Sequence, residues 1–112
     1  MRWTNWKILI YDNEFDPPNY KGPACYELGL GGKSVNPKNS VYVGETGNLY
    51  RRMNEHGSGR SHLNNILTES IYNNKLIYCR YIKFSTRSEA QILQNNLLDR
   101  YNYKWNDQLN SI

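Results

Sequence analysis

The sequence predicts an α/β domain of the α+β type, in which a small, mainly antiparallel sheet of three or four strands is flanked by three helices. Several short segments are rich in β-branched and aromatic residues, which is typical of strands. Other segments repeat apolar residues at helical spacing. Two strand segments, 24–30 and 41–44, are joined by a glycine-containing loop without a helical pattern, which favours an antiparallel hairpin.

The strand segments are identified by their composition and alternation. The first is rich in Trp, Ile and Tyr and ends before residues 16–19, which include two prolines. Val41 and Val43 alternate with other residue types in a later segment. Tyr26 and Tyr42 can lie on the same face of the sheet, although the sequence does not fix the register. The expected strands are residues 3–11, 24–30, 41–44 and 76–84.

The first helix follows the strand 41–44 after a short turn. Thr46 or Asn48 can cap this helix, because both side chains accept hydrogen bonds from backbone N–H groups. Arg52 and His56 are four residues apart and therefore lie one helical turn apart on the same side. A strand thus delivers a tyrosine, and the next helix delivers an arginine and a histidine, to one neighbourhood. Such a set of side chains suits chemistry on a phosphate.

Two further helices are expected at residues 63–71 and 86–101. Thr86 and Glu89 have the spacing of a capping box at the start of the last helix. Gln94 lies in the middle of the stripe that is expected to face inward, and a buried amide requires hydrogen-bond partners. It therefore either belongs to a local network or faces a site. The stripe comprises Ala90, Leu93, Gln94, Leu97, Leu98 and Tyr101.

Length and composition predict one domain covering residues 1–112, with a single modest core. No apolar run approaches about 18 residues and no signal-peptide pattern is present, so we expect a soluble, intracellular protein. Cys25 and Cys79 are interpreted as reduced, small core residues. The net charge is +4, and the excess of Lys and Arg falls after residue 50, with nine against five Asp and Glu. This excess fits either a solvated face or a polyanionic partner.

Taken together, these motifs resemble the GIY-YIG nuclease superfamily. Residues 24–26 (Ala-Cys-Tyr) stand at the GIY position and residues 42–44 (Tyr-Val-Gly) at the YIG position. Arg52 follows the second tyrosine by ten residues, as the family's arginine does, and His56 follows four residues later. The resemblance extends over a core of residues 24–106, with the strand at about 3–11 as an N-terminal addition.

The resemblance implies a role for each matching residue. Tyr26 is expected to act as the general base, with Tyr42 supporting it. Arg52 would hold the scissile phosphate and stabilise the charge that develops there. His56 would assist proton transfer or hold a phosphate oxygen. Gly44 would allow the phosphate to approach the backbone.

The end of the chain also resembles the family but departs from it at one position. Residues 88–98 resemble its closing helix, and Asn106 corresponds to its terminal asparagine, a supporting residue. Gln94 stands where the family has its metal-binding Glu, and a neutral amide binds the expected single Mg²⁺ or Mn²⁺ ion weakly. Ala-Cys in place of Gly-Ile and a long connection between the two tyrosine strands are lesser departures.

The function implied by the resemblance is metal-dependent cleavage of DNA phosphodiester bonds, of restriction, homing or repair type, in a cytoplasmic protein of bacterial or phage type. Gln94 disables it, either as an introduced inactivating substitution, which we favour, or because the chain is a natural relative that only binds nucleic acid. A protein-interaction domain is a third interpretation. The expected partner is double-stranded or branched DNA, with a homodimer or a larger protein supplying specificity.

Overall fold

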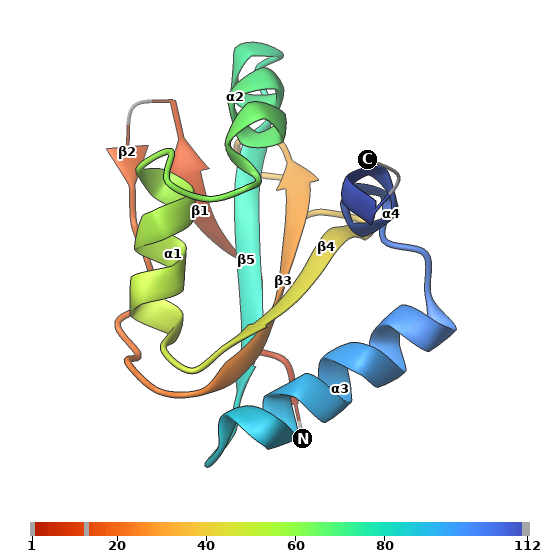
Figure 1. The fold of residues 1–112 in the computed structure, drawn as a ribbon. Coiled ribbons are helices and arrows are strands. Elements are labelled where there is room, and N and C mark those ends of the chain that lie inside the picture. Colours follow the sequence, from red (N-terminus) through yellow and green to blue (C-terminus); the bar gives the residue numbers. More distant parts are fainter. Residues whose placement is uncertain (1, 13, 111–112) are drawn as a thin grey trace.

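The computed structural model describes residues 2–12 and 14–110, and its centre is a five-stranded sheet (Figure 1). The strand order is β2-β1-β5-β3-β4, and every neighbouring pair is antiparallel. This confirms the predicted class and adds the short strand β2. The strands are β1 (Lys7–Tyr11), β2 (Glu14–Phe15), β3 (Ala24–Gly31), β4 (Ser40–Thr46) and β5 (Leu76–Lys83).

The register of β3 places the two tyrosines on one face. Tyr26 pairs with Gly44 on β4, and Leu28 pairs with Tyr42. Tyr26 and Tyr42 are therefore diagonal neighbours on the same face, because side chains alternate along a strand. Their ring centroids are 6.1 Å apart.

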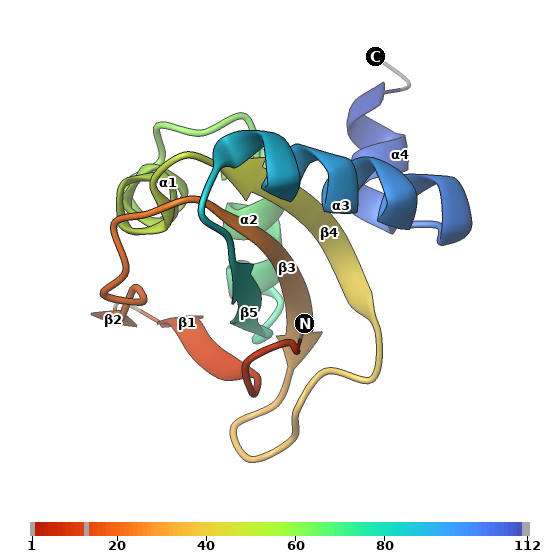
Figure 2. The same ribbon diagram turned by 90° about the horizontal axis from the view of Figure 1, so that it is seen from below.

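Helices cover both faces of the sheet. In Figure 2, α1 and α2 lie inside the arc formed by β3 and β4, whereas α3 lies outside it. The face that carries Tyr26 packs against α1 and α2, and the opposite face, with Cys25 and Val43, packs against α3. The helices are α1 (Leu49–Gly57), α2 (Asn64–Tyr72), α3 (Arg87–Arg100) and α4 (Lys104–Asn110). Both cysteines are free and buried, as expected.

The apolar stripe expected along α3 is only partly correct. Ala90 is buried, and Leu93 and Leu97 pack against the core. Leu98, however, is 36% exposed and Tyr101 is 55% exposed. The reason is geometric, since α3 runs out beyond the edge strand β4 and its last turn has no sheet beneath it (Figure 1).

The helix α4, which the sequence pattern did not predict, closes the edge of the sheet. Asn106 accepts a hydrogen bond from the Val43 N–H (2.9 Å) and donates one to the Val43 carbonyl oxygen (2.9 Å). Its carboxamide therefore takes the place of a neighbouring strand at this edge. Trp105 is buried in the core on the α1 and α2 side, whereas Tyr103 is buried on the α3 side.

A charged network connects the N-terminal segment to the sheet face that packs against α3. The Arg80 guanidinium lies between the rings of Trp3 and Trp6, at 4.9 and 4.5 Å from their centroids. Arg80 also forms an ion pair with the buried Glu27 (2.6 Å), whose carboxylate accepts a hydrogen bond from the Tyr103 hydroxyl. The chain leading into α4 is thus fixed by a buried polar contact. No helix among the described residues is long and apolar enough to cross a membrane.

Candidate active site

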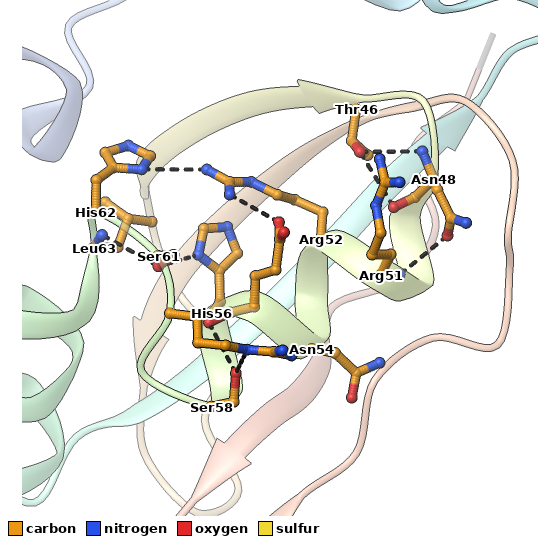
Figure 3. Close-up of polar contacts among 12 residues, drawn as sticks. Thr46, Asn48, Arg51, Arg52, Asn54, His56, Ser58, Ser61, His62 and Leu63 are labelled. Atoms are coloured by element: carbon orange, nitrogen blue, oxygen red, sulfur yellow. Dashed lines mark hydrogen bonds and ion pairs between the residues drawn. The ribbon is translucent and has the colours of Figure 1, made fainter.

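Tyr26 and His56 form the buried part of a polar cluster between α1 and the sheet. The Tyr26 hydroxyl lies 2.9 Å from His56 Nε2. Tyr26 is 1% exposed and His56 is 2% exposed. The second ring nitrogen of His56, Nδ1, lies 2.8 Å from Ser61 Oγ, and that oxygen accepts a hydrogen bond from the Leu63 N–H. The imidazole is therefore held at both nitrogens, and Figure 3 shows the contact with Ser61.

Arg52 lies one turn before His56 and is held at both ends of its guanidinium. One amino group, Nη1, donates to Glu55 Oε1 at 3.0 Å, and the other, Nη2, lies 3.2 Å from His62 Nδ1 (Figure 3). The side chain remains 25% exposed. Because both amino groups are fixed, the fork is ordered while it still reaches solvent, as the capture of an anion requires.

Tyr42 joins the buried and the exposed parts of the cluster. Its hydroxyl lies 3.4 Å from His62 Nε2. Its ring contacts the rings of Tyr26, His56 and His62, with centroids 6.0–6.3 Å apart. The two tyrosines, Arg52 and His56, which the sequence analysis singled out, are thus brought together with His62.

The electrostatics of the cluster favour neutral side chains around one cation. Burial raises the pKa of Tyr26 well above its usual value, and Tyr42 adds to this effect. Burial also raises the pKa of Tyr42, although Arg52 opposes the increase. Burial, together with the charge of Arg52 and the ring of His62, lowers the pKa of His56 to about 3. At neutral pH, Arg52 is therefore the charged group that faces solvent here, with Glu55 beside it.

Sequence comparison agrees with this geometry. The profile of the GIY-YIG catalytic domain matches residues 34–108, which is more than half of the chain. The chain belongs to the GIY-YIG family. No curated protein and no solved structure matches it. The match includes Tyr42, Arg52 and His56 but begins after β3, so the place of Tyr26 in the site depends on the register of the sheet and on its contact with His56.

Position 44 requires glycine because the Tyr26 ring packs directly against it. A Cβ atom at this position would lie 2.6 Å from both Cζ and the hydroxyl oxygen of Tyr26. A side chain at position 44 would therefore collide with the Tyr26 ring, whereas the expected approach of a phosphate to the Gly44 backbone stays a prediction. Asn106 lies outside the polar cluster. Its two hydrogen bonds to the backbone of Val43 fix the edge strand β4, which carries Tyr42 and Gly44.

Whether a divalent ion fits the chain depends on Gln94 and on three carboxylates, those of Glu45, Glu55 and Glu89. GIY-YIG nucleases use such an ion, and Mg²⁺ in proteins is usually held by one or two carboxylates together with water and substrate oxygens. Gln94 is half-buried on α3 and supplies only a neutral amide. Glu45 forms an ion pair with Arg87 (2.8 Å), Glu89 completes the capping box of α3, and Glu55 binds Arg52. Within residues 2–12 and 14–110, no group of three or more His, Cys, Asp or Glu could hold a metal. These donors do not fit a divalent ion.

Three residues of the cluster, Glu55, Ser61 and His62, were not predicted from the sequence. Glu55 could have been found, because it lies three residues after Arg52 on a helix and an ion pair at that spacing is common. The signal for His62 is weaker. It is one of only two histidines in the chain, and it follows the loop that leaves the end of α1.

Proposed function

We propose that this chain is a GIY-YIG endonuclease domain that binds a DNA phosphodiester at Arg52 but lacks the carboxylate needed to cleave it efficiently. The observation that carries the proposal is the cluster itself, in which an ordered guanidinium lies beside two tyrosines and two histidines. The carboxylates of Glu45, Glu55 and Glu89 are already paired. The basic net charge of +4 is consistent with a polyanionic partner.

The phosphate would bind at the Arg52 fork. Arginine binds phosphate through paired N–H donors, and a fork that is already ordered loses little conformational entropy on binding. In cleavage, the same donors would stabilise the charge that develops on the phosphoryl oxygens. A bound phosphate would also neutralise the Arg52 guanidinium. The pKa of His56 would then be lowered less than in the free protein, because the charge of Arg52 is one cause of its low value.

The proton path would run from the attacking water through Tyr26 to His56. We take the Tyr26 O–H to donate to His56 Nε2, so that Nδ1–H donates to Ser61 Oγ, which also accepts from the Leu63 N–H. This assignment gives an acceptor to the Tyr26 O–H and to the His56 Nδ1–H. A phenol can then accept the proton of water while it passes its own to the imidazole. Tyr42, on the exposed side of Tyr26, would orient that water.

A divalent ion, Mg²⁺ or Mn²⁺, would stabilise the leaving oxygen if a carboxylate stood at position 94. With Gln94 in that place, we expect DNA binding without efficient cleavage. The same observation favours a second candidate function, a natural nucleic-acid-binding module with the same fold. Both functions predict DNA affinity that weakens steeply with salt, whereas a protein-interaction domain predicts no such affinity.

The decisive experiment compares this protein with its Gln94→Glu variant on supercoiled plasmid, in Mg²⁺ or in EDTA. We expect only the Glu variant in Mg²⁺ to nick or linearise the DNA, and Arg52→Ala in that background to abolish the activity. Arg51→Ala is the matched control, because it removes the same charge from the adjacent position without a place in the cluster. If neither protein cuts but both bind DNA, the binding module is correct. If neither cuts nor binds plasmid, branched DNA or RNA, the proposal is wrong.

A further inference from the structure

His62 bridges Arg52 and Tyr42 and lies outside the proposed proton path. It is exposed and lies between the end of α1 and the start of α2. Its Nδ1 lies 3.2 Å from Arg52 Nη2, and its Nε2 lies 3.4 Å from the Tyr42 hydroxyl. It therefore contacts Arg52 on α1, as Figure 3 shows, and Tyr42 on the edge strand β4.

The chemistry of the guanidinium fixes the protonation of this ring. Arginine has only N–H donors and remains charged, so its partner must be an acceptor. Nδ1 of His62 therefore carries no proton, and the neutral ring carries its proton on Nε2. That proton points at the Tyr42 oxygen, which accepts it. The histidines at positions 62 and 56 would then have opposite tautomers, since His56 donates from Nδ1 in the arrangement proposed above.

We propose that His62 is a positioning residue of the phosphate site, which holds the Arg52 fork and the Tyr42 hydroxyl in their relative places. The inference rests on the proposed phosphate binding at Arg52. Glu55 holds Nη1 of the fork and His62 holds Nη2, so removal of either partner leaves the long side chain free to adopt other rotamers. His62 is the only one of these partners that also contacts a tyrosine of the cluster.

The positioning role of His62 requires its imidazole ring to be neutral. A protonated His62 carries a hydrogen on Nδ1, which faces the Arg52 donor, so the attractive contact becomes a repulsion between two cations. The groups that face His62 are Arg52 from α1 and Tyr42 from β4, with Glu55 and His56 behind Arg52 on the same helix. Burial, followed by the charge of Arg52, lowers the pKa of His62, which keeps the ring neutral at neutral pH.

The first test measures DNA binding in EDTA at pH 7.5 by fluorescence anisotropy. His62→Ala should weaken binding by about three- to tenfold, as expected for the loss of one ordering hydrogen bond. His62→Asn should retain most of the affinity, because its amide oxygen can occupy the Nδ1 position and accept from Arg52. In an Arg52→Ala background, His62→Ala should have no further effect. Equal losses in both backgrounds would overturn the positioning role.

The pH profile distinguishes positioning from direct phosphate binding. Between pH 7.5 and 5.5, the affinity of the unaltered protein should fall relative to that of His62→Asn, which does not titrate. A rise relative to His62→Asn would show that the imidazolium binds the phosphate itself, and this result would overturn the proposal.

A third measurement is independent of DNA. Nitrogen-15 NMR of the two histidines at pH 7.5 should show Nδ1 of His62 unprotonated and Nε2 protonated, and Arg52→Ala should shift His62 towards a mixture of tautomers. A protonated Nδ1, or populations that Arg52→Ala leaves unchanged, would refute the inference. If the tautomers behave as expected but the protein does not bind DNA, the proposed function has failed while the contact between His62 and Arg52 stands.

Discussion

Replacement of Gly44 by alanine tests whether the close packing of β4 against Tyr26 holds the site together. The added Cβ would lie 2.6 Å from Cζ and from the hydroxyl oxygen of Tyr26, and an ordinary contact begins at 3.4 Å. The ring must therefore move by about 0.8 Å. A movement of that size away from His56 would stretch the present 2.9 Å contact beyond hydrogen-bond range.

We expect Gly44→Ala to lower the free energy of unfolding by about 1–3 kcal/mol, the usual cost of overpacking a well-packed core. For a domain of this size, the melting temperature should fall by about 4–12 °C. Urea unfolding and thermal unfolding followed by circular dichroism measure both quantities. Gly47→Ala is the matched control, because its Cβ would meet only Arg87 Cδ at 3.6 Å, which is an ordinary contact.

The packing argument also predicts strong coupling between the two positions. Tyr26→Leu removes the atoms that the new Cβ would strike, so Gly44→Ala should cost much less in that background than in the unaltered protein. The reasoning is refuted if Gly44→Ala is as stable as Gly47→Ala, or if its cost is the same with leucine at position 26.

Two further predictions concern stability. The pKa of His56 is about 3 in the folded protein, against an ordinary value of 6.5, so the unfolded state binds more protons between these values and stability falls as the pH decreases below 6.5. This side chain should lower the free energy of unfolding by about 2 kcal/mol between pH 7 and pH 5, and equal pH dependence in His56→Gln would contradict the prediction. Asn106→Ala should cost about 1–3 kcal/mol in urea unfolding, because the N–H and C=O of Val43 lose their partner. Asn54→Ala, which removes a single bond to a helical carbonyl, should cost less, and equal losses would argue against the edge-closing role.

The helices that carry local signals were predicted well from the sequence. Asn48 caps α1, and Thr86 and Glu89 form the capping box of α3. Such caps need only neighbouring residues, so a pattern in the chain is enough to find them. The helix α4 could not be found in this way. It is only seven residues long, and it depends on the burial of Trp105 and the pairing of Asn106 with the edge strand.

The site residues divide in the same way, into those that a local pattern predicts and those that only long-range contacts bring together. Tyr42, Arg52 and His56 belong to one strand, turn and helix, so their proximity follows from local structure. Tyr26 joins them only through the register between β3 and β4, which the sequence does not fix. His62 joins them through a loop that returns over the end of α1 to meet Arg52. No local periodicity encodes such a return, although the family resemblance placed the other four correctly near one another.

The residues proposed to bind phosphate and the position proposed for a metal ligand lie on different helices, so under the proposed function the chain could keep the first role without the second. Arg52 and its partners lie on the sheet face covered by α1 and α2, and they hold one another through side-chain contacts. Gln94 belongs to α3, which is fixed on the opposite face by its capping box and by Ala90 and Leu93. Neither of the contacts that hold the Arg52 guanidinium, with Glu55 and with His62, involves Gln94, so a change between glutamine and glutamate at position 94 should leave the fork in place. Under the proposed function, Gln94→Glu should therefore gain cleavage without a change in DNA affinity in EDTA.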